Sequence, residues 1–98
     1  MSKYYISTAI AYVNAPPHIG HALEFIQADA LSRYHRLIGD DTFFLTGTDE
    51  HGVKIYETAK GKGIEPQALV DENAEHFEAL GETLDLSNDD FIRTSSAR

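Results

Sequence analysis

Short apolar runs alternate with longer segments of helical periodicity along the whole chain. The apolar runs cover residues 4–11, 42–46 and 91–94, and the helical patterns cover residues 20–37, 53–60 and 66–84. The first run predicts a buried strand, and the second has the character of an interior strand of a parallel sheet. Strands that alternate with helices indicate an α/β fold with right-handed crossovers, in which ligands bind beyond the carboxyl ends of the strands.

Glycine and proline mark where the expected helices begin and end. Gly39 follows the first helix at a position where positive φ is usual, Gly61–Gly63 stop the second helix, and Pro66 stands in the first turn of the third. The apolar residues that recur at helical spacing in the first helix are Leu23, Ile26, Ala30, Tyr34 and Leu37.

Composition limits the function classes. At 98 residues and 42% hydrophobic content, the chain has room for one domain, residues 1–98, and not for two. Its 16 acidic and 8 basic residues give a net charge of -8, and no basic cluster is longer than Lys60–Lys62. We therefore expect little nucleic-acid binding by this segment alone. The chain has no cysteine, which excludes a disulfide framework and a thiolate zinc site within these residues.

The sequence gives no sign of a membrane or secretory protein. No stretch is long and apolar enough to span a bilayer, and the N-terminus lacks a signal-type apolar block. We therefore expect a cytoplasmic location and no membrane partner. The chain stops at Arg98 directly after the last expected strand, without a tail or cap, and we interpret this as the end of a fragment.

A first polar cluster, Pro16–His21, lies where the first strand leads into the first helix. A helix N-terminus offers unpaired amides and the positive end of a dipole, so phosphate is a natural ligand there. His18 and His21 could both donate hydrogen bonds to such a ligand, and Gly20 would let a flat ring or a phosphate approach the backbone. The cluster suits a nucleotide, although two surface histidines that cap a helix would have the same sequence.

A second polar cluster, Thr46–Gly52, ends the second expected strand and would lie beside the first cluster if the two strands are neighbours. Asp49 at a strand's carboxyl end could hold an ammonium group through a charge-assisted hydrogen bond. It could equally cap the following helix, as could Thr48. A third possibility is a metal site formed by His18, His21 and His51 with Asp49. The residues alone leave these interpretations open.

Three segments in the same order carry a family resemblance. Tyr5–His21 resembles the HIGH signature of class I aminoacyl-tRNA synthetases, with the preceding run typical of the methionyl branch. Thr46–Gly52 and Asp89–Thr94 are also similar to methionyl-branch segments. The resemblance implies the first half of a class I catalytic domain, with a Rossmann-like parallel sheet and flanking helices. It implies a methionine–tRNA ligase that uses ATP with Mg²⁺ and the substrates L-methionine and tRNA(Met).

The resemblance also implies roles toward ATP. His18 and His21 would contact the phosphates and stabilise charge in the transition state as positioned donors, not as general bases. Gly20 would lie against the adenine. Glu24, one helical turn after His21, is a further candidate near the nucleotide.

For the amino acid, Asp49 matches the family residue that binds the α-ammonium group. Ile10 and Tyr12 match residues that line the methionine side-chain pocket, where an unbranched thioether favours an apolar and aromatic surface. Ala11 departs from the family, because many relatives have a bulkier residue there, and this could alter the edge of the pocket.

Other family elements are missing from these residues. The lysine-rich KMSKS loop has no counterpart, since Lys60–Gly63 has neither its sequence nor its context. The connective insertion with its frequent zinc knuckle and the helical anticodon-binding domain are also missing. Two other function classes remain open from the sequence: a non-catalytic nucleotide-binding module, and a metal-dependent hydrolase.

We expect these 98 residues alone to have little or no synthetase activity, because they carry only the HIGH half of the implied ATP site. A pyrophosphate-exchange assay on the isolated chain checks this expectation. Turnover close to that of a complete synthetase would contradict it.

Overall fold

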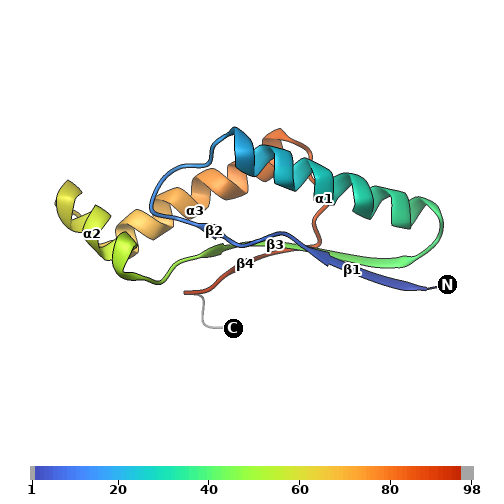
Figure 1. Ribbon diagram of the computed structural model, residues 1–98, viewed down its shortest axis with the longest axis horizontal. Helices are drawn as coiled ribbons and strands as arrows, with labels where there is room; N and C mark the ends of the chain where they lie inside the picture. The colour runs from blue at the N-terminus through green and yellow to red at the C-terminus, as the bar shows by residue number, and fades with distance from the viewer. Residues whose placement is uncertain (1, 96–98) are drawn as a thin grey trace.

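A computed structural model describes residues 2–95 and contains one parallel sheet with helices (Figure 1). In chain order the elements are β1 (Lys3–Ser7), β2 (Ala11–Tyr12), α1 (Ile19–Leu37), β3 (Asp41–Asp49), α2 (Val53–Lys62), α3 (Pro66–Thr83) and β4 (Asp90–Arg93). The order of strands and helices follows the alternation in the sequence. The predicted α/β class with a Rossmann-like parallel sheet is confirmed.

β3 organises the sheet, because all three other strands pair with it in parallel. Leu45 pairs with both Ser7 of β1 and Asp90 of β4, so these two strands lie on opposite edges of β3. β2 continues along the β1 edge, where Tyr12 pairs with Asp49. Strand β3 also runs three residues beyond its predicted end at Thr46, so most of the second polar cluster is part of the sheet.

The prediction of one buried strand over residues 4–11 is wrong in two respects. The chain leaves the ladder between β1 and β2, because the Ala9 N–H donates to a carboxylate oxygen of Glu24 on α1 at 2.8 Å instead of to the sheet. β1 is also partly exposed, because it lies at an edge of the sheet. The side chain of Tyr5, for example, is 61% exposed. Tyr5 stacks on Phe43 of β3, with ring centroids 6.0 Å apart.

The main core forms between the β2–β3 end of the sheet, α1, α2 and α3. Figure 1 shows α1 and α3 on the same side of the sheet. The buried residues of this cluster are Ala11, Val13, Phe25, Ile55, Ala59, Leu69, Val70 and Phe77. Burial of large apolar side chains is the main favourable term in folding, so this cluster holds the helices against the end of the sheet where the polar residues lie.

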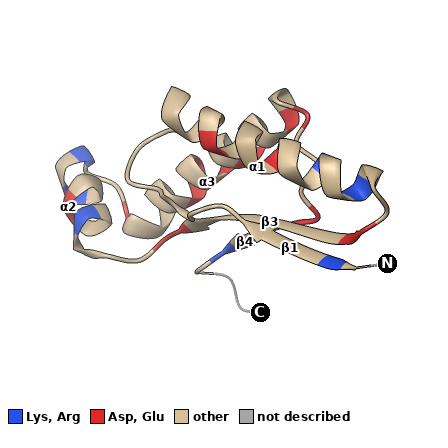
Figure 2. Ribbon diagram, turned by 45° about the vertical axis from the view of Figure 1, so that its right-hand side comes forward, with Lys and Arg blue, Asp and Glu red and all other residues tan. Residues whose placement is uncertain are grey.

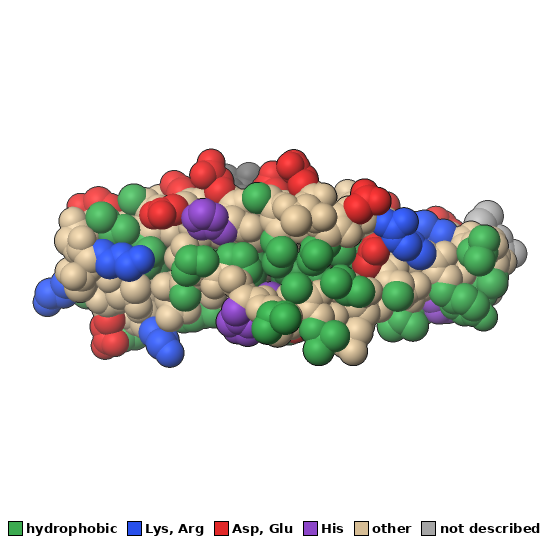
Figure 3. Space-filling model, turned by 90° about the horizontal axis from the view of Figure 1, so that it is seen from above, with side chains coloured by type: hydrophobic (Ala, Val, Ile, Leu, Met, Phe, Trp, Pro, Cys, Tyr) green, Lys and Arg blue, Asp and Glu red, His purple; other side chains and the backbone are tan. Residues whose placement is uncertain are grey.

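The residues that mark α1 in the sequence do not form its buried face. All five positions of that apolar pattern are exposed, and apolar side chains gather along the face seen from above in Figure 3. The side chains that α1 buries are Phe25, Ala28, Asp29 and Ser32. Two of these are polar and are satisfied there: Ser32 donates to the Ala28 carbonyl, and Asp29 accepts hydrogen bonds from Ser87 and Arg33.

The helix ends agree with the sequence prediction. Gly39 and Gly63 have φ values of 93° and 71°, the left-handed conformation that glycine adopts without a steric penalty. Pro66 occupies the first helical position of α3, where its missing N–H costs no hydrogen bond. Within residues 2–95, no helix has the length and apolar character needed to cross a membrane.

Neighbouring phenylalanines on β3 test this arrangement. Phe44 is fully buried and Phe43 is 44% exposed on the opposite face of the sheet. Phe44→Ala should lower the free energy of unfolding by about 3–5 kcal/mol, because it leaves a cavity in the packed layer. Phe43→Ala is the matched control and should cause a smaller loss. Urea denaturation of the chain measures both, and equal losses would contradict the assignment of the two faces.

Candidate functional site

The paired histidines lie at the amino end of α1 and bond to the backbone that begins the helix. His18 is the N-cap residue, and its Nδ1 accepts a hydrogen bond from the Gly20 N–H at 3.0 Å. His21 reaches back, and its Nδ1 accepts from the His18 N–H at 3.1 Å. The two ring centroids are 4.0 Å apart. The capping interpretation of these histidines is therefore correct, and it is compatible with a ligand site because each ring uses only one nitrogen in the cap.

These hydrogen bonds set the tautomer of both rings. A nitrogen that accepts a hydrogen bond carries no proton, so in each neutral imidazole the proton is on Nε2. Both Nε2–H groups are then donors that the cap does not use. Two neighbouring donors at the positive end of a helix dipole are suited to bind an anion such as a phosphate.

The expectation of unpaired backbone amides at this helix end is largely wrong. The Gly20 N–H is taken by the His18 ring, and the N–H groups of His21 and Ala22 both bond to the His18 carbonyl oxygen. The donors available to a ligand are therefore mainly imidazole groups. Gly20 has a further role here, because a Cβ at this position would lie 2.8 Å from the His18 ring. The glycine allows that ring to fold over the helix start.

His21 is held against aromatic side chains of the core. Its ring packs edge-on against Phe77, with centroids 4.9 Å apart, and lies 6.4 Å from Phe25. Partial burial lowers the pKa of His21 below its ordinary value, and the neighbouring His18 lowers it further, against a smaller opposing effect of Glu24. His21 is therefore neutral at pH 7 and acts as an N–H donor, not as a cation.

The other predicted residues lie at the carboxyl end of the sheet. Tyr12 and Asp49 are paired residues of β2 and β3, and the Val13 N–H donates to the Asp49 carbonyl at 3.3 Å. Ile10 is exposed in the connection just before β2. In Figure 1 the amino end of α1 faces the same end of the sheet at which β2 and β3 finish. Both polar clusters of the sequence thus lie toward one end of the sheet (Figure 1).

Asp49 does not cap the following helix. The N-cap residue of α2 is Gly52, and no side chain caps that helix. Among residues 2–95, the Asp49 carboxylate receives one long hydrogen bond, from the His51 N–H at 3.4 Å. Thr48 is fully buried and donates to Glu50, so it does not cap α2 either. The Asp49 carboxylate remains available for a ligand.

The side chain of Glu24 links α1 to the connection between β1 and β2 through its bond to the Ala9 N–H. It therefore lies over the connection that precedes Ile10, and not free in solvent. The metal alternative required His18, His21 and His51 to converge. In the part of the chain that the structure describes, no group of three or more His, Cys, Asp or Glu side chains could hold a metal ion.

A buried ion pair beside Asp49 was missed in the sequence. Glu50 lies in the same polar cluster, and its side chain is 0% exposed. Arg93 of β4 donates to both of its carboxylate oxygens at 2.7 Å. The only signal in the sequence was that both residues belong to the two family-like segments, and nothing there indicated that they meet.

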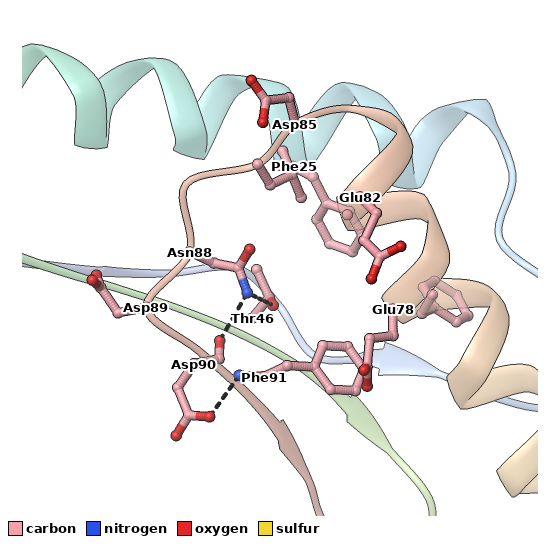
Figure 4. Close-up of a pocket in the computed structure, with 12 residues that line it drawn as sticks. Phe25, Thr46, Glu78, Glu82, Asp85, Asn88, Asp89, Asp90 and Phe91 are labelled. Carbon is pink, nitrogen blue, oxygen red and sulfur yellow. Dashed lines mark hydrogen bonds between the residues drawn. The ribbon is translucent and has the colours of Figure 1, made fainter.

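A cavity of about 630 Å³ lies between α1, α3 and the segment that leads into β4 (Figure 4). Its lining is apolar at Phe25, Phe77 and Phe91, and several carboxylates surround it. Asn88 spans it on one side by donating to Thr46 Oγ1 and to the Asp90 carbonyl oxygen. None of the seven residues predicted for nucleotide or amino-acid binding lines this cavity.

Comparison with known proteins identifies close relatives. Residues 4–98 match the model of the family described as tRNA synthetases class I (M). The chain is 56% identical over 96 residues to a methionine–tRNA ligase of Brucella suis and 55% identical over 97 residues to one of Rhizobium meliloti. A solved structure of Mycobacterium tuberculosis methionyl-tRNA synthetase in complex with methionyl-adenylate superposes with a TM-score of 0.97 at 49% identity.

These matches extend over almost all of this chain and a small part of the relatives. They cover 98% of the chain for the Brucella protein and 99% for the Rhizobium protein and the Mycobacterium structure, and 19% of each relative. The chain therefore spans about a fifth of the length of the relatives that it matches.

The histidine pair can be tested by NMR of ¹⁵N-labelled histidine. We expect His21 to be protonated at Nε2 in its neutral form and to titrate below 6.5, its ordinary value. Because the unfolded chain then binds protons more readily, this residue's contribution to stability decreases as the pH falls from 6.5 through the lower pKa of the folded state.

His18→Asn is the matched variant, since Asn keeps a cap acceptor and removes the second imidazole. It should raise the midpoint of His21 toward 6.5. An unchanged midpoint, or an Nδ1-protonated ring, would contradict the described geometry.

Proposed function

This chain belongs to the family of class I (M) tRNA synthetases, and from that premise we propose that it serves methionine–tRNA ligation. It forms part of the Rossmann-like catalytic domain that activates L-methionine with ATP to methionyl-adenylate, before transfer to tRNA(Met). The proposal is supported by two features at the same end of the sheet, which the amino end of α1 faces (Figure 1). These are the paired imidazole donors of α1 and the available carboxylate of Asp49.

His18 and His21 act on ATP as positioned donors. Their Nε2–H groups bind phosphate oxygens and stabilise the charge that develops as the methionine carboxylate attacks the α-phosphate. The lowered pKa of His21 keeps the ring neutral, so it supplies a hydrogen bond and takes no proton. Gly20 lies against the adenine in this proposal. Glu24, one helical turn after His21, lies near the nucleotide, and its carboxylate also accepts a hydrogen bond from the Ala9 N–H.

Asp49 binds the α-ammonium group of methionine through a charge-assisted hydrogen bond. Ile10 and Tyr12 line the thioether pocket, for which an exposed aliphatic and an aromatic side chain at this edge are suited. Ala11 is buried in the core cluster beside them. Its small size therefore changes the packing under the pocket and leaves the ligand-facing edge to its two neighbours.

The remaining partners belong to the whole protein. Mg²⁺ would accompany the ATP phosphates. Residues 2–95 contain no group of three or more His, Cys, Asp or Glu side chains that could hold a metal ion, and we assign no residue of this chain to it. For tRNA(Met), Figure 2 draws Lys and Arg scattered over α1, α2 and the strands β1 and β4, among more numerous acidic residues. We assign tRNA recognition to other parts of the protein, and a cytoplasmic location goes with this function.

In the natural gene product, substitutions in the two halves of the site should affect methionine and ATP differently. Asp49→Asn should weaken methionine binding roughly 10- to 100-fold, because it removes a charged hydrogen-bond partner, and should change ATP binding little. Asp41→Asn, at the opposite end of the same strand, is the control and should change neither. Calorimetric titration with each ligand measures these affinities.

His21→Gln keeps the capping-box acceptor and should slow adenylate formation by roughly 10²–10³ with little change in methionine affinity. Two results would contradict the assigned roles. One is an equal loss of affinity for methionine and ATP in Asp49→Asn, and the other is a defect of His21→Gln that is confined to methionine binding. If ATP binds while no adenylate forms even in the unaltered protein, the chain is a non-catalytic nucleotide-binding module instead.

A further inference from the structure

Two consecutive carboxylates at the end of β3 have opposite environments. Within the described part of the chain, the Asp49 carboxylate accepts one long hydrogen bond, whereas the Glu50 side chain is completely excluded from solvent. A buried carboxylate is costly unless its oxygens are fully paired. The partners of Glu50 are therefore informative about what the site requires.

The oxygens of Glu50 receive four hydrogen bonds. Arg93 donates to both of them at 2.7 Å in a bidentate arrangement, and the hydroxyl groups of Thr48 and Ser95 each donate to one. Burial alone would raise the pKa of Glu50, but the hydrogen bonds from Arg93 and the two hydroxyls hold it below its ordinary value. Glu50 is therefore ionised, and its charge is neutralised by Arg93.

Thr94, the residue that follows Arg93, bonds to the backbone on both sides of Asp49. The Thr94 N–H donates to the Thr48 carbonyl at 3.2 Å, and the Glu50 N–H donates to Thr94 Oγ1 at 2.8 Å. On the other edge Asp49 pairs with Tyr12. The residues immediately before and after Asp49 are thus tied to β4, while Asp49 itself is tied to β2.

We propose that the Glu50–Arg93 ion pair is a positioning element for Asp49, and this rests on the proposed role of Asp49 as the ammonium site. The pair locks the tip of β3, so the Asp49 carboxylate has one orientation. Arg93 also neutralises the Glu50 carboxylate, so an ammonium group at this end of the sheet has Asp49 as its single anionic partner. Without Arg93, an unpaired buried charge would force Glu50 to turn out or bind a proton, which would displace Asp49.

The test uses the natural gene product and compares affinities for methionine and ATP by calorimetry. Arg93→Met keeps the length of the side chain and removes its charge. It should weaken methionine binding about tenfold and leave ATP binding within about twofold. The double variant Glu50→Gln and Arg93→Met removes both charges, and it should recover a large part of the lost methionine affinity because no uncompensated charge remains.

Asp71→Asn is the matched control. Asp71 is more than half exposed and accepts a hydrogen bond at 2.6 Å from the same Arg93 Nη2 that donates to Glu50. In Asp71→Asn both hydrogen bonds from Arg93 to Glu50 can remain. The substitution should leave both affinities unchanged. If Arg93→Met does not fold, Arg93→Lys keeps the charge and loses the bidentate fork. It should then cause a smaller loss that is again confined to methionine.

The outcomes separate the two proposals. If Asp49→Asn leaves methionine affinity unchanged, the proposed role of Asp49 fails, whatever Arg93 does. If Asp49→Asn weakens methionine binding but the Arg93 variants weaken both ligands equally, or change only the unfolding temperature, the ion pair is purely structural. The positioning role then fails and the proposed function stands.

Discussion

The structure depends on parallel pairing along both edges of β3. Among the strands of residues 2–95, β3 alone has neighbours on both sides, and all of them run in its direction. Parallel strands end at the same edge of a sheet, so this register brings Tyr12, Asp49 and Arg93 together although they are distant in sequence. The amino end of α1 faces that edge as well (Figure 1). Changes in the register of β3 would therefore separate Asp49 from Tyr12 and Arg93.

Features that depend on a few neighbouring residues could be predicted from the sequence. The ends of α2 and α3 follow from the backbone preferences of Gly63 and Pro66, which hold in any protein. The buried face of α1 could not be predicted, because Asp29 and Ser32 are polar. Asp29 is tolerated in the interior since Ser87, 58 residues away, donates to it. A periodic pattern locates a helix but does not say which distant partners make a polar face suitable for burial.

In the candidate site, too, local features could be predicted and features that depend on distant partners could not. The spacing of His18 and His21 predicted a pair of donors at a helix start, and local hydrogen bonds then determine which nitrogen of each ring carries the proton. The position of Asp49 followed from its place at the end of a strand. The pairing of Glu50 with Arg93 could not be inferred, because it requires the register between β3 and β4. Non-local pairing is the information that composition and periodicity lack.

The most direct measurement of the central claim is a crystal structure of the natural gene product with a non-hydrolysable methionyl-adenylate analogue. The account predicts the ammonium nitrogen of the analogue within hydrogen-bond distance of the Asp49 carboxylate. It also predicts a phosphate oxygen beside Nε2 of His18 or His21. An analogue bound instead in the acidic cavity between α3 and β4, or with its phosphate remote from the start of α1, would contradict the claim.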